Sequence, residues 1–503
     1  MDFFNHLALG FGVTCSPTNL LFCFVGVLIG TLIGVLPGIG PVATISLLLP
    51  VSFGMEPVTS IIMLAGVYYG AMYGGSTTSI LVNIPGEAAS IITCLDGYQM
   101  ARQGRAGPAL GMSAFGSFIG GTVSIIGLMV FAPLLARLAL KFGPTENFAL
   151  MLFGLTMVTY LCMGSITKGL IMAVAGLALS TIGTDMISGI PRFTLESLTL
   201  MDGVGLVPVA MGMFGIGEIL TNIEGGIKRE IFAAKIGGLF PTLQDWLACK
   251  WPIVRGTLIG FFIGVLPGGG AVIPTFISYS VEKRLSRHPK KFGTGMIEGV
   301  AAPETANNAA TGGSMVTLLS LGIPANVTMA VLLGAFIIHG IQPGPFLIQK
   351  YPALFWGTIA SMYIGNGMLL VLNLPLIGIW IKILKIPYNI LFPLIFLFCF
   401  LGVYSLNNNI YEILIMIVFG VFGYLTRKFG FEGAPFLLAM VLGPMLENAL
   451  RQSLVYGDPI IFFKRPISAV LLTINLFMLI LAIFPKIARK RKELEAILEK
   501  EGP

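Results

Sequence analysis

The chain contains the stretch IGVLPGIGP at Ile33–Pro41, and nearly the same stretch, IGVLPGGGA, returns at Ile263–Ala271. Each copy lies within an apolar run of membrane-spanning quality, and each places a Pro and several Gly where an unbroken helix would otherwise continue. Backbone that leaves the helical conformation at membrane depth needs protein or a water-filled cavity to satisfy its N–H and C=O groups. Paired interruptions in two parts of a chain therefore predict the binding site of a membrane transporter.

The composition identifies the class of protein. Hydrophobic residues make up 55% of the 503 residues, charged residues make up only 11%, and the mean hydropathy is +0.90. Such a chain has too little polar surface to cover a soluble globule of this size, so we expect an all-α, polytopic membrane protein. The uncharged segment Ile467–Phe484 is long enough to cross a bilayer at about 1.5 Å per residue. Similar runs along the chain predict about 10 to 14 crossings.

The charged residues predict topology. The N-terminal MDFFNHLALGFG has no Lys or Arg, which argues against a cleaved secretory signal. The formal net charge of +7 comes from basic residues that cluster in short loops between spans, so they do not point to a nucleic-acid partner. The positive-inside rule places the basic loop Val281–Lys291 and the basic C-terminal tail in the cytoplasm.

A second motif follows each copy of the first. YGGSTTSILVNIPGE occupies Tyr73–Glu87, and TGGSMVTLLSLGIPAN occupies Thr311–Asn326. Two motifs in the same order predict a duplicated membrane unit. The predicted organisation is an N-terminal segment (1–19), a first transmembrane repeat (20–222), a basic connecting loop (223–252), a second transmembrane repeat with C-terminal spans (253–485) and a cytoplasmic tail (486–503).

Charges in equivalent loops predict that the repeats are inverted. Val51–Pro57 carries no Lys or Arg, whereas its equivalent, Val281–Lys291, is strongly basic. Similarly, Arg102 and Arg105 stand in the loop equivalent to the uncharged His339–Pro345. A third pair of loops is basic in both halves and does not support inversion. On the two pairs that differ, we expect inverted repeats with Gly/Pro-broken helices or re-entrant hairpins at the site.

The broken helices suggest the chemistry of the ligand. A helix that restarts after LPGxG presents free N–H groups and a partial positive charge to the break, which favours an anion such as a carboxylate. The GGS motifs add hydroxyl and amide groups that can donate to carboxylate oxygens or coordinate a hard cation such as Na⁺. The candidate substrate- and ion-binding residues are Pro37, Gly38, Gly40, Gly74, Gly75, Ser76, Thr77, Thr78 and Asn83 in the first half, and Pro267, Gly268, Gly270, Asn307, Asn308, Thr311, Gly313, Ser314 and Thr317 in the second.

Close helix packing is the alternative explanation for these residues. Small residues let helices approach one another, and Ser or Thr can bond to its own helix. Four acidic residues near the breaks, Glu87, Asp96, Glu298 and Glu304, also have two explanations. A carboxylate at membrane depth is costly and suggests a role in ion coupling, whereas one at a helix start only complements the helix dipole.

The sequence offers no catalytic or metal-binding constellation. His6, His288 and His339 form no ligand cluster, and the six Cys contain no CxxC pair. We therefore expect no resident metal, no cofactor and no enzymatic activity. An uncoupled solute or ion channel is the alternative to a carrier.

The motifs together resemble a known family. LPGIGPVATISLLLP, YGGSTTSILVNIPGE, LDGYQMARQGRAG, LPGGGAVIP, APETANNAATGG and LGIPANVTMAVLLGAFIIHGIQPGP are similar to the large membrane subunit of the bacterial tripartite tricarboxylate transporters, over nearly the whole chain. The resemblance implies a cation-coupled, usually Na⁺-driven, importer of citrate-like carboxylates in the inner membrane, with an elevator-like movement of its site. It also implies two partners: a small membrane subunit and a periplasmic solute-binding protein.

The resemblance also implies which residues form the family's signatures. One position departs from the pattern, because this chain has Asn326 in IPANVT where the family more often has a Gly-Ser after the Pro, so the cargo can differ from citrate. The matching residues are Pro37, Gly38, Gly40, Pro41, Gly74, Gly75, Ser76, Asn83, Pro267, Gly268, Gly270, Glu304, Asn307, Asn308, Gly312, Gly313 and Pro324.

Overall fold

The computed structural model describes residues 2–36, 40–161, 165–185, 187–225, 238–384 and 388–483. The candidate site residues Pro37 and Gly38, part of the predicted connecting loop and the predicted tail lie outside these residues. The described chain is almost entirely helical, which confirms the predicted all-α class.

The first helices lie on either side of the first LPG motif in the chain and extend to Ser180. They are α1 (Asp2–Thr14), α2 (Pro17–Val35), α3 (Gly40–Phe53), α4 (Pro57–Val82), the 3₁₀ turn η1 (Ala88–Ser90), α5 (Ile91–Thr93), the π-helical turn η2 (Cys94–Tyr98), α6 (Gln99–Arg102), α7 (Ala106–Ala139), α8 (Pro144–Leu161) and α9 (Ile166–Ser180).

A small antiparallel pair of strands, β1 (Gly183–Thr184) and β2 (Pro191–Arg192), separates these helices from the rest. After it come α10 (Leu198–Met201), α11 (Leu206–Ala210), the π-helical turn η3 (Met211–Ile216) and α12 (Gly217–Gly225).

The remaining helices include the second LPG motif. They are α13 (Leu243–Val265), α14 (Val272–Leu285), the 3₁₀ turn η4 (Pro289–Lys291), α15 (Glu298–Leu321), α16 (Val327–Ile338), α17 (Leu347–Lys350), α18 (Pro352–Asn373), α19 (Ile377–Ile383), α20 (Tyr388–Asn407), α21 (Ile410–Lys428), α22 (Gly433–Tyr456), α23 (Ile461–Lys464) and α24 (Pro466–Ile483).

Eight helical segments of the described chain are long and apolar enough to cross a membrane, by length and composition. Five shorter apolar helices, α3 and α16 among them, accompany them. The short helix α3 begins within the LPG motif at Ile33–Pro41, and the short helix α16 begins after the IPAN segment at Ile323–Asn326, because proline removes a backbone donor and blocks the preceding turn. The fold is therefore that of a multi-pass helical membrane protein.

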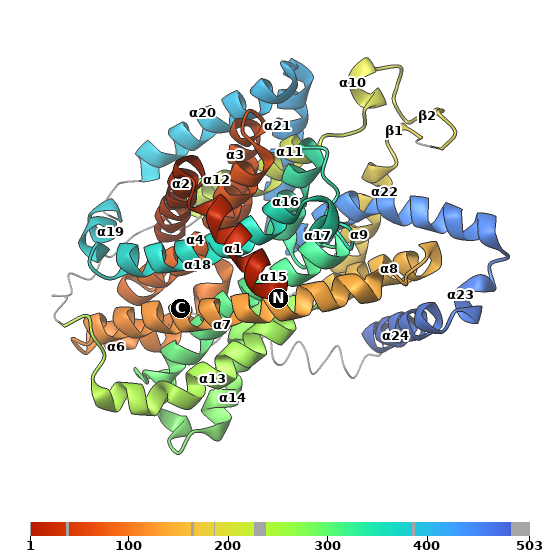
Figure 1. The fold of residues 1–503 in the computed structure, drawn as a ribbon. Coiled ribbons are helices and arrows are strands. Elements are labelled where there is room, and N and C mark those ends of the chain that lie inside the picture. Colours follow the sequence, from red (N-terminus) through yellow and green to blue (C-terminus); the bar gives the residue numbers. More distant parts are fainter. Residues whose placement is uncertain are drawn as a thin grey trace.

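Two helices, α4 and α15, lie at the centre of the molecule (Figure 1). Every residue from Thr59 to Val82 and every residue from Gly299 to Ser320 is buried. Both segments contain many small and polar residues, so their burial is by other helices and not by lipid. The GGS motifs therefore occupy the protein interior.

The helix α2 packs along α4, and α13 packs along α15, through glycines spaced four residues apart. A Cβ on Gly30 would lie 2.5 Å from the Val67 carbonyl oxygen, and a Cβ on Gly260 would lie 2.3 Å from the Ala306 carbonyl oxygen. Only glycine permits such close approach of two backbones. The glycines of this contact are Gly26, Gly30 and Gly34 in α2 and Gly256, Gly260 and Gly264 in α13.

The ends of these two helix pairs also match. Thr78 donates to the last carbonyl of α2 at 2.8 Å, and Thr317 donates to the last carbonyl of α13 at 2.5 Å. The helix α4 ends at Asn83 in a left-handed conformation (φ 58°), and α15 ends at Gly322 in the same conformation (φ 70°). Asn and Gly are the residues that adopt this helix-ending geometry most easily. The two duplicated motifs therefore have the same local structure.

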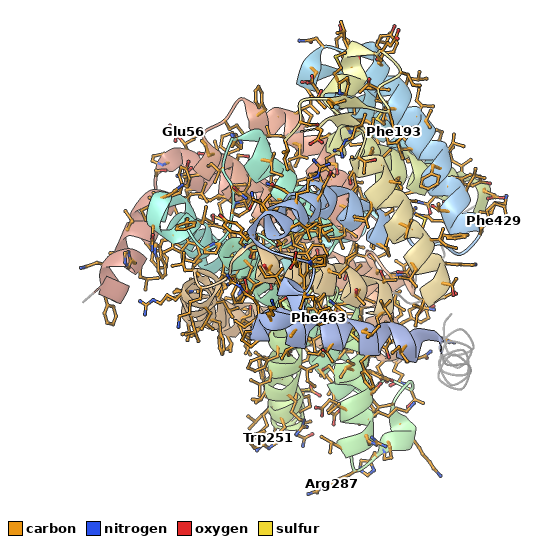
Figure 2. The ribbon with its side chains drawn as sticks, turned by 90° about the vertical axis from the view of Figure 1, so that its right-hand side faces the viewer. Glu56, Phe193, Trp251, Arg287, Phe429 and Phe463 are labelled. Carbon is orange, nitrogen blue, oxygen red and sulfur yellow. The ribbon has the colours of Figure 1, made fainter. Side chains whose placement is uncertain are left out.

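The second LPG motif is the tip of a helical hairpin. Arg255 in α13 forms an ion pair with Glu282 in α14, with Nε and Oε1 2.5 Å apart. Each of these residues lies ten positions from the helix end at the tip, so the two helices run antiparallel from it. Trp251 and Arg287 mark the opposite end of this hairpin, at the bottom of Figure 2, whereas Glu56, which precedes α4, lies near the top.

Candidate functional site

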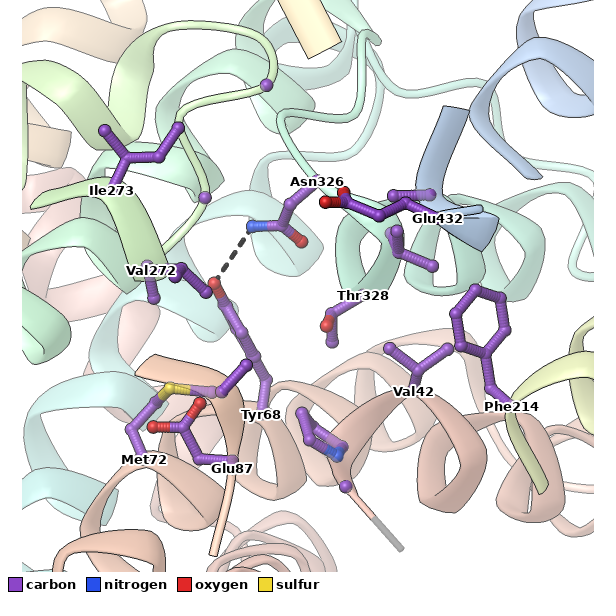
Figure 3. Close-up of a pocket in the computed structure, with 18 of the residues that line it drawn as sticks. Val42, Tyr68, Met72, Glu87, Phe214, Val272, Ile273, Asn326, Thr328 and Glu432 are labelled. Atoms are coloured by element: carbon purple, nitrogen blue, oxygen red, sulfur yellow. Dashed lines mark hydrogen bonds between the residues drawn. The ribbon is translucent and has the colours of Figure 1, made fainter. Parts of the chain in front are cut away.

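A cavity of about 540 Å³ lies where the two LPG motifs and the two GGS motifs meet. This volume is within the range of about 300–1,000 Å³ that is typical of small-molecule sites. Figure 3 shows part of its walls, and the lining residues as a whole come from α3, α4, η1, α8, η3, α12, the tip of the α13–α14 hairpin, α14, α16, α21, the segment before α22 and α22 itself. The lining residues labelled there are Val42, Tyr68, Met72, Glu87, Phe214, Val272, Ile273, Asn326, Thr328 and Glu432.

Three helices begin at the cavity wall. The helix α3 starts at Gly40, α14 starts at Val272 and α16 starts at Val327, and all three residues line the cavity. The first N–H groups of a helix have no partner within the helix, and its N-terminus carries a partial positive charge. The cavity wall therefore presents the N-terminal ends of three helices, the feature that the sequence analysis expects to favour an anion.

Glycines shape the tip of the second hairpin. Gly268 has a φ of +84°, and its N–H donates to the Ala325 carbonyl at 2.7 Å. A Cβ at Gly268 would lie 2.6 Å from the backbone of Val158 in α8. The tip therefore closes against the IPAN segment and against α8, with Gly268, Gly269 and Gly270 exposed to the cavity.

Two hydrogen bonds join the halves across the cavity in a reciprocal way. Thr78 and Thr317 make equivalent hydrogen bonds, so the two halves can be aligned on them. In this alignment Tyr68 is equivalent to Asn307, and Glu87 is equivalent to Asn326. Asn326 Nδ2 donates to the Tyr68 hydroxyl at 3.1 Å (Figure 3).

The equivalent bond also forms, because Asn307 Nδ2 donates to Glu87 Oε1 at 3.2 Å. A reciprocal pair of contacts of this kind is what a local two-fold relation between the two GGS segments would produce.

Glu87 and Asn326 occupy equivalent caps beside the cavity. The Glu87 carboxylate accepts from the Ala89 N–H at 2.7 Å, and the Asn326 side chain accepts from the Met329 N–H at 2.9 Å. One cap is thus an acid and the other a neutral amide, which makes the cavity chemically asymmetric.

Charged residues that the sequence analysis did not select also line the cavity. Arg427, in the last turn of α21, forms an ion pair with Glu218 in α12, and Glu432 lies before α22. These residues belong to none of the repeated motifs, so motif comparison could not find them. Their only signal in the sequence is that charged residues stand at the ends of apolar helices.

The predicted site residues fall into three groups. Gly40, Gly268 and Gly270 line the cavity. Asn307 and Ser314 do not line it, but Asn307 is hydrogen-bonded to the lining residue Glu87, and Ser314 to the lining residue Asn326.

A second group makes contacts typical of helix packing. Pro267 lies against Gly154, and Thr77 is buried within α4. The others bond to helix backbone, cap a helix or fit against a neighbouring helix or side chain: Gly74, Gly75, Thr78, Asn83, Asn308, Thr311, Gly313 and Thr317. The third group is Ser76 alone, whose hydroxyl lies within hydrogen-bond distance of the Met72 carbonyl of its own helix, at 3.2 Å, and of the Glu304 carboxylate in α15.

The four acidic candidates have different surroundings. Glu87 lines the cavity, Glu304 is fully buried between helices, and Glu298 opens α15. Asp96 accepts from the Tyr279 hydroxyl at 2.9 Å and from three backbone N–H groups of residues 293–296. These bonds join η2 to the loop after α14, so the contacts of Asp96 are structural.

Interrupted helices around a central cavity, in a multi-pass helical protein, are typical of the class of membrane permeases. The model of the tripartite tricarboxylate transporter TctA family matches residues 20–438. The chain therefore belongs to the TctA family, which is a family of transporter permeases and points away from an enzyme.

Two proteins of Agrobacterium vitis are similar to this chain. The uncharacterized 52.8 kDa protein of the TAR-I ttuC′ 3′ region is 51% identical over 493 residues, which cover 98% of both chains. The uncharacterized protein of the TAR-II ttuC′ 3′ region is 54% identical over 236 residues, or 46% of this chain and 98% of the relative. No solved structure matches the chain.

Proposed function

We propose that the chain is the permease subunit of a secondary importer of tricarboxylates or related carboxylates, and that the cavity holds the substrate. The observation that carries this proposal is the convergence of three helix N-termini on one cavity in a member of a tricarboxylate transporter family. Free N–H groups at these termini can donate to carboxylate oxygens. The Arg427 guanidinium at the same wall can donate two parallel hydrogen bonds to one carboxylate.

The charges of the lining favour cation coupling, with Na⁺ as the coupling ion. Glu87, Glu218 and Glu432 line the cavity together with one basic residue, Arg427. A polyanion that enters such a site meets like charges, which weaken binding unless cations enter with it. Coupling to a cation gradient therefore suits both the binding energy and the direction of transport.

The partners follow from the tripartite family. We expect a periplasmic solute-binding protein to deliver the carboxylate and a small membrane subunit to accompany the permease. The location consistent with both partners is the bacterial inner membrane, with a cytoplasmic C-terminus on the positive-inside rule.

Uptake by proteoliposomes tests this function. The purified permease and small subunit are reconstituted, and uptake of radiolabelled citrate is measured with and without an inward Na⁺ gradient and the solute-binding protein. We expect accumulation only when both are supplied. Uptake that is indifferent to both would support an uncoupled channel and contradict the carrier.

We also propose that a two-fold axis relates the two repeats and lies in the membrane plane, so that the repeats are inverted. The support is the charge difference between the loops 51–57 and 281–291. Single Cys substitutions at 52–56 and at 282–291 are labelled in intact cells with a membrane-impermeant maleimide. Labelling of only the 52–56 set is expected, and labelling of both sets from the same side would refute inversion.

A further inference from the structure

A second polar centre lies away from the cavity, around the fully buried Glu304. Its carboxylate accepts hydrogen bonds from Ser76 in α4 and Thr93 in α5. It also accepts from two serines one turn apart on α7, Ser113 at 3.1 Å and Ser117 at 3.5 Å. Three segments, α4, α5 and α7, therefore converge on one acidic side chain of α15.

The charge of this carboxylate has no counter-charge in the described part of the chain. The ion pairs found there all involve other acidic residues. Neutral hydroxyl donors stabilise a buried carboxylate but do not neutralise it, and an isolated buried charge costs several kcal/mol. The carboxylate is neutralised either by a proton or by a bound cation.

The donor set identifies the class of cation. Hydroxyl and carboxylate oxygens are ligands that hard cations prefer, and each hydroxyl has lone pairs free to turn toward a metal ion. One carboxylate balances one positive charge, so a monovalent ion leaves the site neutral, whereas a divalent ion would leave a buried excess charge. A proton needs only one acceptor, which makes a shell of four hydroxyls from three segments more than protonation requires.

An unsatisfied acceptor links this centre to the cavity. Asn307 lies one turn after Glu304 on α15 and is fully buried, and among the described residues its Oδ1 has no hydrogen-bond donor. Its Nδ2 donates to Glu87, which lines the cavity. A buried amide oxygen without a donor is costly, so this acceptor is open to a ligand.

We propose that Glu304, with the hydroxyls of Ser76, Thr93, Ser113 and Ser117, forms the binding site of a co-transported Na⁺, connected to the substrate cavity through Asn307. The role of the ion as a driving force rests on the proposed function, whereas the binding of Na⁺ at this site does not depend on it. Occupation of the site neutralises the region behind Glu87 before a carboxylate enters. The site would thus couple the ion to the substrate through contiguous side chains.

Binding of ²²Na⁺ to the full-length protein in detergent tests the site without any substrate. Unlabelled Na⁺ should displace the tracer from the wild type, whereas choline should not. Glu304→Gln should abolish binding and eliminate the rise in Tm with Na⁺ at constant ionic strength. Ser113→Ala, which removes one neutral ligand, should weaken Na⁺ affinity by about five- to tenfold.

Ser124→Ala is the matched control, because Ser124 is a buried serine on the same helix whose hydroxyl donates to the Gly121 carbonyl of its own helix. Its Na⁺ affinity should equal that of the wild type. Gel filtration checks the fold of each variant, and Ser113→Ala keeps the test decisive if Glu304→Gln does not fold.

Unchanged Na⁺ affinity in Ser113→Ala, or in a folded Glu304→Gln, would overturn the site. A wild type that binds no Na⁺ and responds only to pH would overturn it in favour of a proton. Citrate uptake by a protein that binds no Na⁺ would contradict the ion site but not the proposed permease function. Na⁺ binding without carboxylate uptake would contradict the proposed permease function but not the ion site.

Discussion

The helix pairs α2–α4 and α13–α15 have the same backbone packing but carry different polar groups. Glycines spaced four apart, a threonine bonded to the last carbonyl of the partner helix, and a left-handed final residue occur in both pairs. The cavity side differs, because an acid, Glu87, stands where the other half has the amide Asn326. Helix packing therefore requires the same residue types in both halves, whereas the binding of an asymmetric ligand requires different residues in each half.

The largest expected effect tests the shared packing. Gly260→Val should prevent accumulation of folded protein, because the new Cβ would lie 2.3 Å from a carbonyl of α15, and Gly30→Val should do the same at the equivalent contact. Fluorescence size-exclusion of tagged variants measures the folded fraction. Gly367→Ala is the control, since a Cβ there meets no atom within 4 Å. If only one of the two valine variants misfolds, the packing of the halves is not equivalent.

The next effect concerns a charge that neither repeated motif supplies. Arg427→Ala should weaken carboxylate binding by about 10- to 100-fold, because hydrogen bonds to charged groups contribute about 1.5–3 kcal/mol. Isothermal titration of the purified protein with citrate measures the loss. Lys428→Ala, beside it, removes a charge that pairs with the exposed Glu224 and should leave the affinity as it is. Equal losses in the two variants would indicate a general charge effect.

An opposite change is expected at the partner of this arginine. Glu218→Gln should strengthen carboxylate binding by about three- to tenfold, since the substrate would no longer compete with Glu218 for Arg427. The same titration, repeated at several salt concentrations, separates the loss of this direct competition from a loss of long-range repulsion, because salt screens the long-range repulsion more strongly. Weaker binding in Glu218→Gln would mean that Glu218 positions Arg427 for the substrate.

The smallest expected effect concerns the reciprocal bonds across the cavity. Tyr68→Phe should reduce the rate of citrate uptake by about two- to fivefold, because Asn326 keeps its second bond, to Ser314 at 3.2 Å. Asn307→Ala breaks the equivalent bond, which holds an acid, and should cost more. Initial rates of uptake for both single variants and the double variant measure the coupling. Equal effects would show that the acid at position 87 does not distinguish the halves.

The fold class was predictable because its signals are local. Apolar run length identifies spans, Pro and Gly identify breaks, and two motifs in the same order identify a duplication. The sequence also selected Gly40, Gly268 and Gly270, which line the cavity, because each belongs to a break.

Other parts of the site were not predictable for a physical reason. The polar residues of the GGS motifs look alike in the sequence, yet Thr78 and Thr317 bond the backbone of a neighbouring helix, whereas Ser76 bonds its own helix and also a carboxylate. Which of these occurs depends on the helix opposite, and that helix is distant in the chain. The same holds for Ser113 and Arg427, which become neighbours of the site only through packing.

The sequence by itself determined that this chain is a helical membrane protein with paired breaks in its helices, since hydropathy and proline act on their own segments. Tertiary structure decided that the breaks meet at one cavity, that Glu87 and Asn326 are equivalent caps, and that Glu304 accepts hydrogen bonds from four hydroxyls. Those relations join residues from different helices, and the energies that select them arise only when the helices pack.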